Sequence, residues 1–139
     1  MLVEDSAQDE ALTLRQLQAV SDDTDIAVAG DGEKALAFIL DRIGDGEEPV
    51  QKLPDLVILD LKLPKIDGHD VLRELRANRH TRNIPVVVFS SSDEERDIAR
   101  SYELGANSYV QKPVNFEDFK RTMATLGKYW VSMNLSPRS

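Results

Sequence analysis

Residues 56–60 of the sequence read LVILD, and residues 61–68, which follow directly, read LKLPKIDG. Four branched apolar residues in a row, with no polar alternation, are typical of a strand that is buried on both faces, as in the middle of a parallel sheet. Asp60 then stands at the carboxyl end of this strand, where open α/β sheets place their ligand sites. A turn residue or a helix cap would also fit this position. The interpretation of Asp60 therefore depends on what the other strands contribute.

Short strands and helices alternate along the rest of the chain. Strands are predicted over residues 1–3, 24–29, 86–90 and 108–110, and helices over residues 6–17, 33–43, 68–78, 93–104 and 115–130. Within the helices the apolar residues recur at spacings of three and four, as in Ala7, Ala11, Leu14 and Leu17 of the first helix and Phe116, Phe119, Met123 and Leu126 of the last. This alternation predicts a parallel sheet with helices on both faces, a doubly wound α/β domain.

The composition is that of one domain over residues 1–139, in which we expect residues 136–139 to form a disordered tail. The chain has no cysteine, which excludes disulfides and thiolate metal sites. Acidic residues outnumber basic ones 25 to 17, and the net charge of −8 argues against binding to nucleic acid, which needs a basic surface. No stretch approaches the roughly 18 apolar residues of a membrane span. We therefore expect a cytoplasmic protein with no membrane contact.

Reactive side chains follow four of the five predicted strands. Glu4 and Asp5 follow the first strand, Asp60 the third, Ser90 the fourth and Lys112 the fifth. Because the carboxyl ends of parallel strands meet at one edge of the sheet, we expect these side chains to share a shallow pocket. Carboxylates held so close together need a cation to offset their charge. A hard divalent ion with oxygen ligands, such as Mg²⁺, is the natural choice.

A pocket of this kind is suited to phosphoryl transfer onto Asp60. Phosphoryl transfer requires a protein mainly to position the reactants and to neutralise the charge on the phosphoryl oxygens. The metal would take one oxygen, the Lys112 ammonium a second and the Ser90 hydroxyl a third. The product would be an aspartyl phosphate at Asp60.

In their order and spacing these motifs resemble the receiver domains of two-component response regulators, and the resemblance covers essentially the whole chain. It implies a flavodoxin-like five-stranded sheet in the order 2-1-3-4-5 with five helices. It also implies that Asp60 is the phospho-acceptor and that Mg²⁺ is bound by Glu4, Asp5, Asp60 and the main-chain carbonyl of Lys62. Glu4 differs from the aspartate that many members carry there, and its extra methylene should shift a water-bridged contact to the metal.

The same resemblance assigns the remaining site residues. Ser90 and Lys112 match the hydroxyl and the lysine that contact the phosphoryl group. Ser90 and Tyr109 match the switch pair, in which the aromatic ring turns inward as the hydroxyl shifts toward the phosphate. The protein is then a signalling domain rather than an enzyme, and it assists only its own phosphorylation and dephosphorylation.

Three further segments are similar to the single-domain response regulators that work with bacterial phytochrome kinases: residues 44–54, residues 102–109 and the pair Tyr129-Trp130. This similarity implies that a sensor histidine kinase, with a bacterial phytochrome as the candidate, donates the phosphoryl group. Only 27 residues follow Lys112, so output would come through protein–protein interaction, dimerisation or phosphorelay. Tyr129 and Trp130, an apolar pair near the end of the last helix, are the candidate homodimer contact.

Three alternatives compete with this interpretation. Haloacid-dehalogenase-type phosphatases resemble this chain in their strand-end aspartate, but they need a second aspartate at the position that Lys62 occupies. A flavodoxin-like electron carrier would have to bind a phosphate where Glu4 and Asp5 would repel it. The alternative that stays open is a receiver fold that serves only as a docking module and is never phosphorylated.

Overall fold

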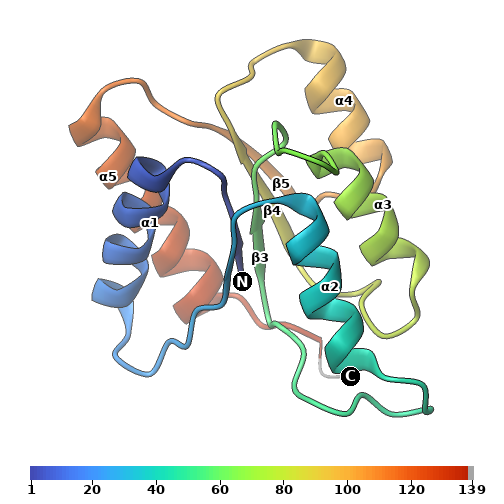
Figure 1. The fold of residues 1–139 in the computed structure, drawn as a ribbon. Coiled ribbons are helices and arrows are strands. Elements are labelled where there is room, and N and C mark those ends of the chain that lie inside the picture. Colours follow the sequence, from blue (N-terminus) through green and yellow to red (C-terminus); the bar gives the residue numbers. More distant parts are fainter. Residues whose placement is uncertain (138–139) are drawn as a thin grey trace.

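The computed structural model describes residues 1–137 and contains one five-stranded sheet in the order β2-β1-β3-β4-β5 (Figure 1). Every neighbouring pair of strands runs parallel. The strands are β1 (Leu2–Val3), β2 (Val28–Ala29), β3 (Val57–Leu59), β4 (Val86–Ser90) and β5 (Ser108–Gln111). The predicted doubly wound topology and its strand order are confirmed.

Helices cover both faces of the sheet, with α1 and α5 on one side and α2, α3 and α4 on the other (Figure 1). Their bounds are α1 (Ala7–Val20), α2 (Gly32–Ile43), α3 (Gly68–Ala77), α4 (Glu95–Glu103) and α5 (Phe116–Gly127), and a π-helical segment, η1 (Lys128–Met133), follows α5 directly. None of the helices within residues 1–137 is both long enough and apolar enough to cross a membrane.

The strands divide their side chains between two apolar cores because successive residues of a strand point to opposite faces. Val3, Leu59 and Val88 belong to the core beneath α2 and α3, whereas Ile58 and Phe89 belong to the core beneath α1 and α5. Nearly all of these side chains are fully buried. This two-sided burial fixes the register of the central strands and therefore fixes which residues emerge at their carboxyl ends.

Side-chain caps fix the start of four helices at the carboxyl-terminal edge of the sheet. The capping oxygen accepts a hydrogen bond from the main-chain N–H three residues later, which satisfies one of the unpaired donors of the first turn. The capping residues are Ser6, Asp31, Asp67 and Asn115. The loops that surround the expected pocket are thus held by local hydrogen bonds.

Several element boundaries differ from the predicted ones. The second strand was expected over residues 24–29, but β2 is confined to Val28–Ala29, because β1 is only two residues long and offers no further partners. The fourth helix begins at Glu95 rather than at residue 93. In α1 the buried side chains are Thr13 and Leu17, while Ala7 and Ala11 are exposed. Small side chains bury little apolar area, so the larger ones decide which face of the helix packs.

The end of the chain also departs from the prediction of one continuous helix to residue 130. The α-helical part of α5 stops at Gly127, where a Cβ would lie close to the side chains of Leu17 and Val20 of α1, at 3.1 and 3.0 Å. The segment η1 then carries Trp130 toward the amino-terminal edge of the sheet. Phe116, which belongs to the apolar stripe of the last predicted helix, is 47% exposed at the first turn of α5. Of the predicted tail, Ser136 donates a hydrogen bond to the Asp55 carbonyl at 3.0 Å, and residues 138–139 lie outside the described part.

Candidate functional site

Three carboxylates gather at the carboxyl-terminal edge of the sheet. Glu4 and Asp5 follow β1, and Asp60 follows β3, the neighbouring strand. One oxygen from each of the three lies within 4.8 Å of the others. Glu4 and Asp60 are buried, whereas Asp5 is exposed to solvent. Carboxylate oxygens are the donors that hard divalent cations prefer, so this set fits a Mg²⁺-like ion with one side open to water.

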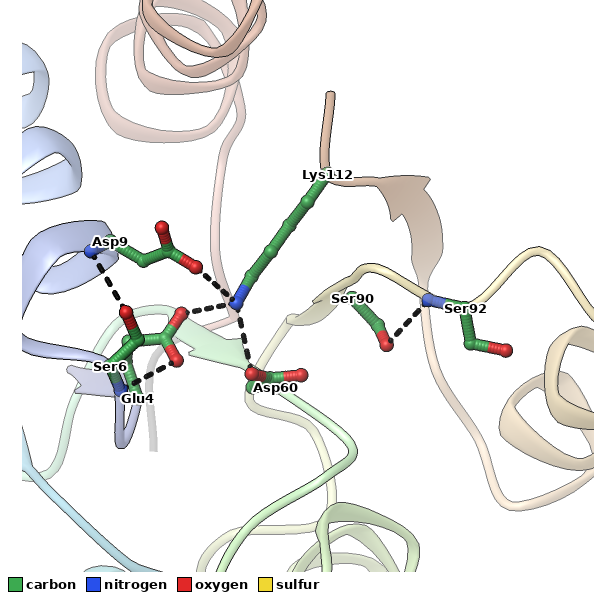
Figure 2. Close-up of polar contacts among 7 residues, drawn as sticks. All are labelled: Glu4, Ser6, Asp9, Asp60, Ser90, Ser92 and Lys112. Carbon is green, nitrogen blue, oxygen red and sulfur yellow. Dashed lines mark hydrogen bonds and ion pairs between the residues drawn. The ribbon is translucent and has the colours of Figure 1, made fainter. Parts of the chain in front are cut away.

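Lys112, which follows β5, reaches into this acidic cluster (Figure 2). Its Nζ lies 2.6 Å from Oε1 of Glu4, 2.9 Å from Oδ2 of Asp60 and 3.0 Å from Oδ2 of Asp9. The side chain is only 8% exposed. Its main-chain N–H donates to the Ser90 carbonyl at 2.7 Å, which extends the β4–β5 pairing and fixes where the side chain starts. Lys112 therefore compensates the negative charge of Glu4, Asp5 and Asp60, and these four side chains together are called the pocket below.

Burial and mutual contact shift the pKa values of Glu4 and Lys112. Burial raises the pKa of the Glu4 carboxyl to about 7; its contact with Lys112 opposes this rise, and the nearby charge of Asp60 adds to it. Burial by itself lowers the pKa of the Lys112 ammonium, but the contacts with Glu4 and Asp60 outweigh burial and leave that pKa above its usual value. Lys112 is therefore a cation at neutral pH, and the Glu4 carboxyl keeps its proton to a higher pH than an ordinary glutamate does.

Ser90 ends β4 with its hydroxyl buried beside the pocket. Leu59 of β3 pairs with Val88 of β4, so Asp60 and Ser90 emerge one and two residues beyond that pair. Figure 2 shows Glu4 and Ser90 on opposite sides of Asp60. The Ser90 hydroxyl accepts a hydrogen bond from the main-chain N–H of Ser92 at 3.2 Å, which ties it to the loop before α4.

Tyr109, on β5, contacts the same loop. Its phenolic hydroxyl donates to the main-chain carbonyl of Ser92 at 2.8 Å, and its ring packs against the core beneath α2 and α3. Burial raises the pKa of the phenol, so it remains a hydrogen-bond donor at neutral pH. The Ser92 hydroxyl in turn donates to the Asp97 carboxylate of α4 at 2.6 Å. Ser90, Tyr109 and α4 are thus joined through one loop residue.

Glycine at position 68 lets the loop after Asp60 fold back closely. A Cβ at Gly68 would lie 2.2 Å from the main-chain oxygen of Asp60, so no other residue fits without displacing the acceptor strand. The Gly68 N–H donates to the Leu61 carbonyl at 2.8 Å. Lys62, whose carbonyl was the predicted fourth metal ligand, lies within this tight turn with its side chain exposed to solvent.

The structure brings most of the predicted site residues together. Glu4, Asp5, Asp60 and Lys112 share the pocket, and Ser90 and Tyr109 meet at the neighbouring loop. Tyr129 and Trp130 instead lie near the opposite edge of the sheet, where Trp130 lines a groove with Met1 and Phe38. Their rings contact each other edge to face with centroids 5.0 Å apart.

Asp9 is the one residue beside the pocket that the sequence did not reveal. By sequence it is only an acid at the third position of a helix that Ser6 caps. Its carboxylate nevertheless contacts Lys112 directly. Its position in the sequence could have indicated this role, because Asp9 comes one helical turn after the Glu4–Asp5 pair, at the end of α1 that faces the pocket.

The class of protein is indicated by the fold together with the site. A parallel sheet carries an acidic pair, an aspartate, a hydroxyl and a lysine at the carboxyl ends of its strands. The chain belongs to the response regulator receiver domain family, whose model matches residues 1–124. Members of this family act as phosphorylation-dependent signalling switches.

Two curated relatives match nearly the whole chain. The response regulator Rcp1 of Synechocystis sp. (strain ATCC 27184 / PCC 6803 / Kazusa) is 37% identical over 131 residues, which cover 94% of this chain and 87% of Rcp1. The probable methanogenesis regulatory protein FilR2 of Methanothrix harundinacea (strain 6Ac) is 39% identical over 137 residues, which cover 99% of this chain and 86% of FilR2.

Solved structures agree with this relationship. The Mn²⁺-bound form of Rcp1 has a TM-score of 0.89 at 36% identity, with 99% of this chain and 96% of that chain covered. The phosphorylated cyanobacterial phytochrome response regulator RcpA has the same TM-score and coverage at 34% identity. The chain is thus similar to single-domain, phytochrome-associated response regulators.

Proposed function

We propose that Asp60 is the phospho-acceptor of this receiver domain. The observation that carries the proposal is the pairing of a buried strand-end carboxylate with a buried lysine: Asp60 Oδ2 lies 2.9 Å from Lys112 Nζ. A buried ion pair is costly to maintain for stability alone. This cluster of acids around one lysine lies at the edge of the sheet where ligands bind. Chemistry at Asp60 explains it better than a contribution to stability does.

The reaction is a displacement at phosphorus. A carboxylate oxygen of Asp60 forms a bond to the phosphorus of a phosphohistidine, the P–N bond breaks, and the electron pair of that bond returns to the imidazole, which leaves. Lys112 supplies positive charge to the phosphoryl oxygens, and the Ser90 hydroxyl supplies a hydrogen bond. The product is an acyl phosphate on Asp60.

The acidic cluster fits Mg²⁺ as the cation of this site. Asp5 and Asp60 would bind it directly, the Lys62 carbonyl would add a main-chain oxygen, and Glu4 would act through water. A divalent ion bound there supplies charge neutralisation for the incoming phosphoryl group. The observation that supports this assignment is the all-oxygen donor set within 4.8 Å, with Asp5 open to solvent.

The link from phosphorylation to output runs through Ser90 and Tyr109. A phosphoryl group on Asp60 would draw the Ser90 hydroxyl toward it and break the hydrogen bond that Ser90 accepts from Ser92. Ser92 also accepts from Tyr109 and donates to Asp97 of α4. The loop that these residues share is thus the connection between the pocket and the face formed by α4, β5 and α5.

For partners, we infer a sensor histidine kinase as the phosphoryl donor and a second copy of this chain as the output contact. RcpA is a phytochrome response regulator, and this makes a phytochrome-type kinase the first candidate donor. Tyr129 and Trp130 are the proposed dimer contact, and Tyr129 is 47% exposed. Relay of the phosphoryl group to a further protein is the other output open to the domain. A cytoplasmic location fits the family.

Intact-mass measurement after incubation with acetyl phosphate tests the proposal. With Mg²⁺ present the parent should gain one phosphoryl group, and chelation of the metal should prevent the gain. Asp60→Asn should stay unmodified, while Asp55→Asn, which changes an exposed acid at the other end of the same strand, should react as the parent does. No gain in the parent under either condition would favour the unphosphorylated docking module.

A further inference from the structure

Asp9 occupies a position beside the pocket that none of the assigned roles explains. Its carboxylate lies 3.0 Å from Lys112 Nζ, and its side chain is 27% exposed. It is not a member of the three-carboxylate cluster that fits a cation. An ordinary exposed ion pair would contribute little, but here the partner is a lysine that is almost completely buried.

The partners of Lys112 divide into two kinds. Asp60 is also a proposed direct ligand of the metal and Glu4 a proposed contact through water, so a bound cation competes with the lysine for the oxygens of both. Asp9 carries no such second role. When Glu4 and Asp60 turn toward a cation and a phosphoryl group, Asp9 is therefore the carboxylate that can stay paired with the ammonium.

Local hydrogen bonds hold the main chain of Asp9 in place. The Asp9 N–H donates to the Ser6 hydroxyl, and the Ser6 N–H donates to Oε2 of Glu4, both at 3.3 Å. Ser6 thus connects the first turn of α1, through Asp9, to Glu4 of the pocket (Figure 2). Farther along, Leu17 buries α1 against the sheet and α5. The main-chain position of Asp9, from which its carboxylate reaches Lys112, is therefore set by the fold.

We propose that Asp9 is a positioning residue for phosphoryl transfer: it holds the Lys112 ammonium at the pocket while Glu4 and Asp60 are released to the metal and to the phosphoryl group. This inference rests on the proposed role of Asp60 as the acceptor. Without Asp9, the ammonium is shared between Glu4 and Asp60 alone, and it competes more strongly with the cation and shields the nucleophile. Both cation binding and the rate of phosphorylation should then fall.

The first experiment measures the rate of phosphoryl gain from acetyl phosphate at saturating Mg²⁺, by intact mass. Asp9→Asn should slow the rate roughly tenfold, in the range of coupling between residues in contact. Asp9→Glu, which keeps the charge, should recover part of the rate. The matched control is Glu10→Gln, which removes the same charge from the same helical turn and should change the rate less than about twofold. Urea unfolding of each variant verifies that the fold is intact.

The second experiment measures Mg²⁺ affinity by calorimetry, without phosphorylation, in the parent and in Lys112→Ala. Asp9→Asn should weaken Mg²⁺ binding clearly more in the parent than in Lys112→Ala, because its effect acts through the lysine. Equal losses in the two backgrounds, or equal rates for Asp9→Asn and Glu10→Gln, would overturn the inference and leave Asp60 as the acceptor. A parent that gains no phosphoryl group would overturn the proposed function, and the role of Asp9 with it.

Discussion

Lys112 Nζ lies 2.9 Å from Oδ2 of Asp60, although 52 residues separate the two in the chain. β3 and β5, which precede them, are not neighbours, because β4 lies between them in the sheet. The contact depends on the length of the lysine side chain, which crosses the end of β4 to reach the acceptor. The β4–β5 register, with Ser90 opposite Gln111, fixes where that side chain begins.

Lys112→Ala should destabilise the metal-free protein by about 3 kcal/mol, because removal of one partner leaves buried carboxylates without compensating charge. Saturating Mg²⁺ should reduce this loss, since the cation then compensates the same acids. Urea unfolding with and without Mg²⁺ measures both quantities. Lys52→Ala, whose side chain is 83% exposed, is the control and should cost less than about 1 kcal/mol. An equal loss with and without metal would show that the lysine and the cation do not share these carboxylates.

The raised pKa of Glu4 predicts a pH dependence of stability in the metal-free protein. The pKa is about 7 in the fold and near 4.5 in the unfolded chain. Between these two values the folded state binds more protons than the unfolded state, so the free energy of unfolding falls as pH rises through this window. We expect Glu4 to contribute a decrease of roughly 1–3 kcal/mol.

The pH effect is isolated by comparing the parent with Glu4→Gln in denaturant titrations from pH 4.5 to 7.5. The stability of the parent relative to the variant should decline as pH rises, and saturating Mg²⁺ should flatten that decline by favouring the ionised carboxylate. Glu33→Gln, at an exposed position of α2, should leave the profile of the parent unchanged. A relative stability that rises with pH would contradict the raised pKa.

Tyr109→Phe should lower the free energy of unfolding by about 1 kcal/mol, because it deletes the hydrogen bond to the Ser92 carbonyl and keeps the ring. The rate of phosphoryl gain should stay within about twofold of the parent, since the phenol lies outside the acidic cluster. Tyr102→Phe on α4, which is 50% exposed, is the matched control and should change neither quantity. A large drop in rate would place Tyr109 in the chemistry rather than in the response to it.

Tyr129→Ala should weaken self-association if the proposed dimer contact is correct, because it removes an exposed ring from the surface beside Trp130. Sedimentation at several protein concentrations, with and without acetyl phosphate, measures the change. Leu40→Ala removes a comparably exposed apolar side chain from α2 and serves as the control. A sedimentation profile identical to that of the parent would remove Tyr129 from the interface.

The pocket was predictable where its residues follow strands. A run of apolar residues identifies each central strand, and the residue that follows the strand then lies at the carboxyl-terminal edge of the sheet. Asp60 after β3 and Lys112 after β5 are examples. Asp9 escaped this reasoning because it comes from a helix, where spacing alone does not show which first-turn side chain faces the pocket. Its contact with Lys112 depends on how α1 packs against the sheet.

The end of the chain differed from expectation in two places. Phe116 is exposed at the first turn of α5, and η1 replaces the α-helix after Gly127; the apolar spacing of the sequence indicates neither feature. At Gly127 the missing side chain matters only because Leu17 and Val20 lie against it. Tertiary contacts therefore decide the boundaries, whereas the buried strands decide the topology.

The central claim is that Asp60 itself carries the phosphoryl group, and the most direct measurement traps that group in place. The protein is incubated with acetyl phosphate and Mg²⁺ and then reduced with borohydride, which converts an aspartyl phosphate into homoserine, and the resulting peptides are sequenced by mass spectrometry. We predict homoserine at position 60 alone. Homoserine at Asp5, at Asp9 or at any other aspartate, 5-hydroxynorvaline at a glutamate, or no reduced residue anywhere in the chain would contradict the account.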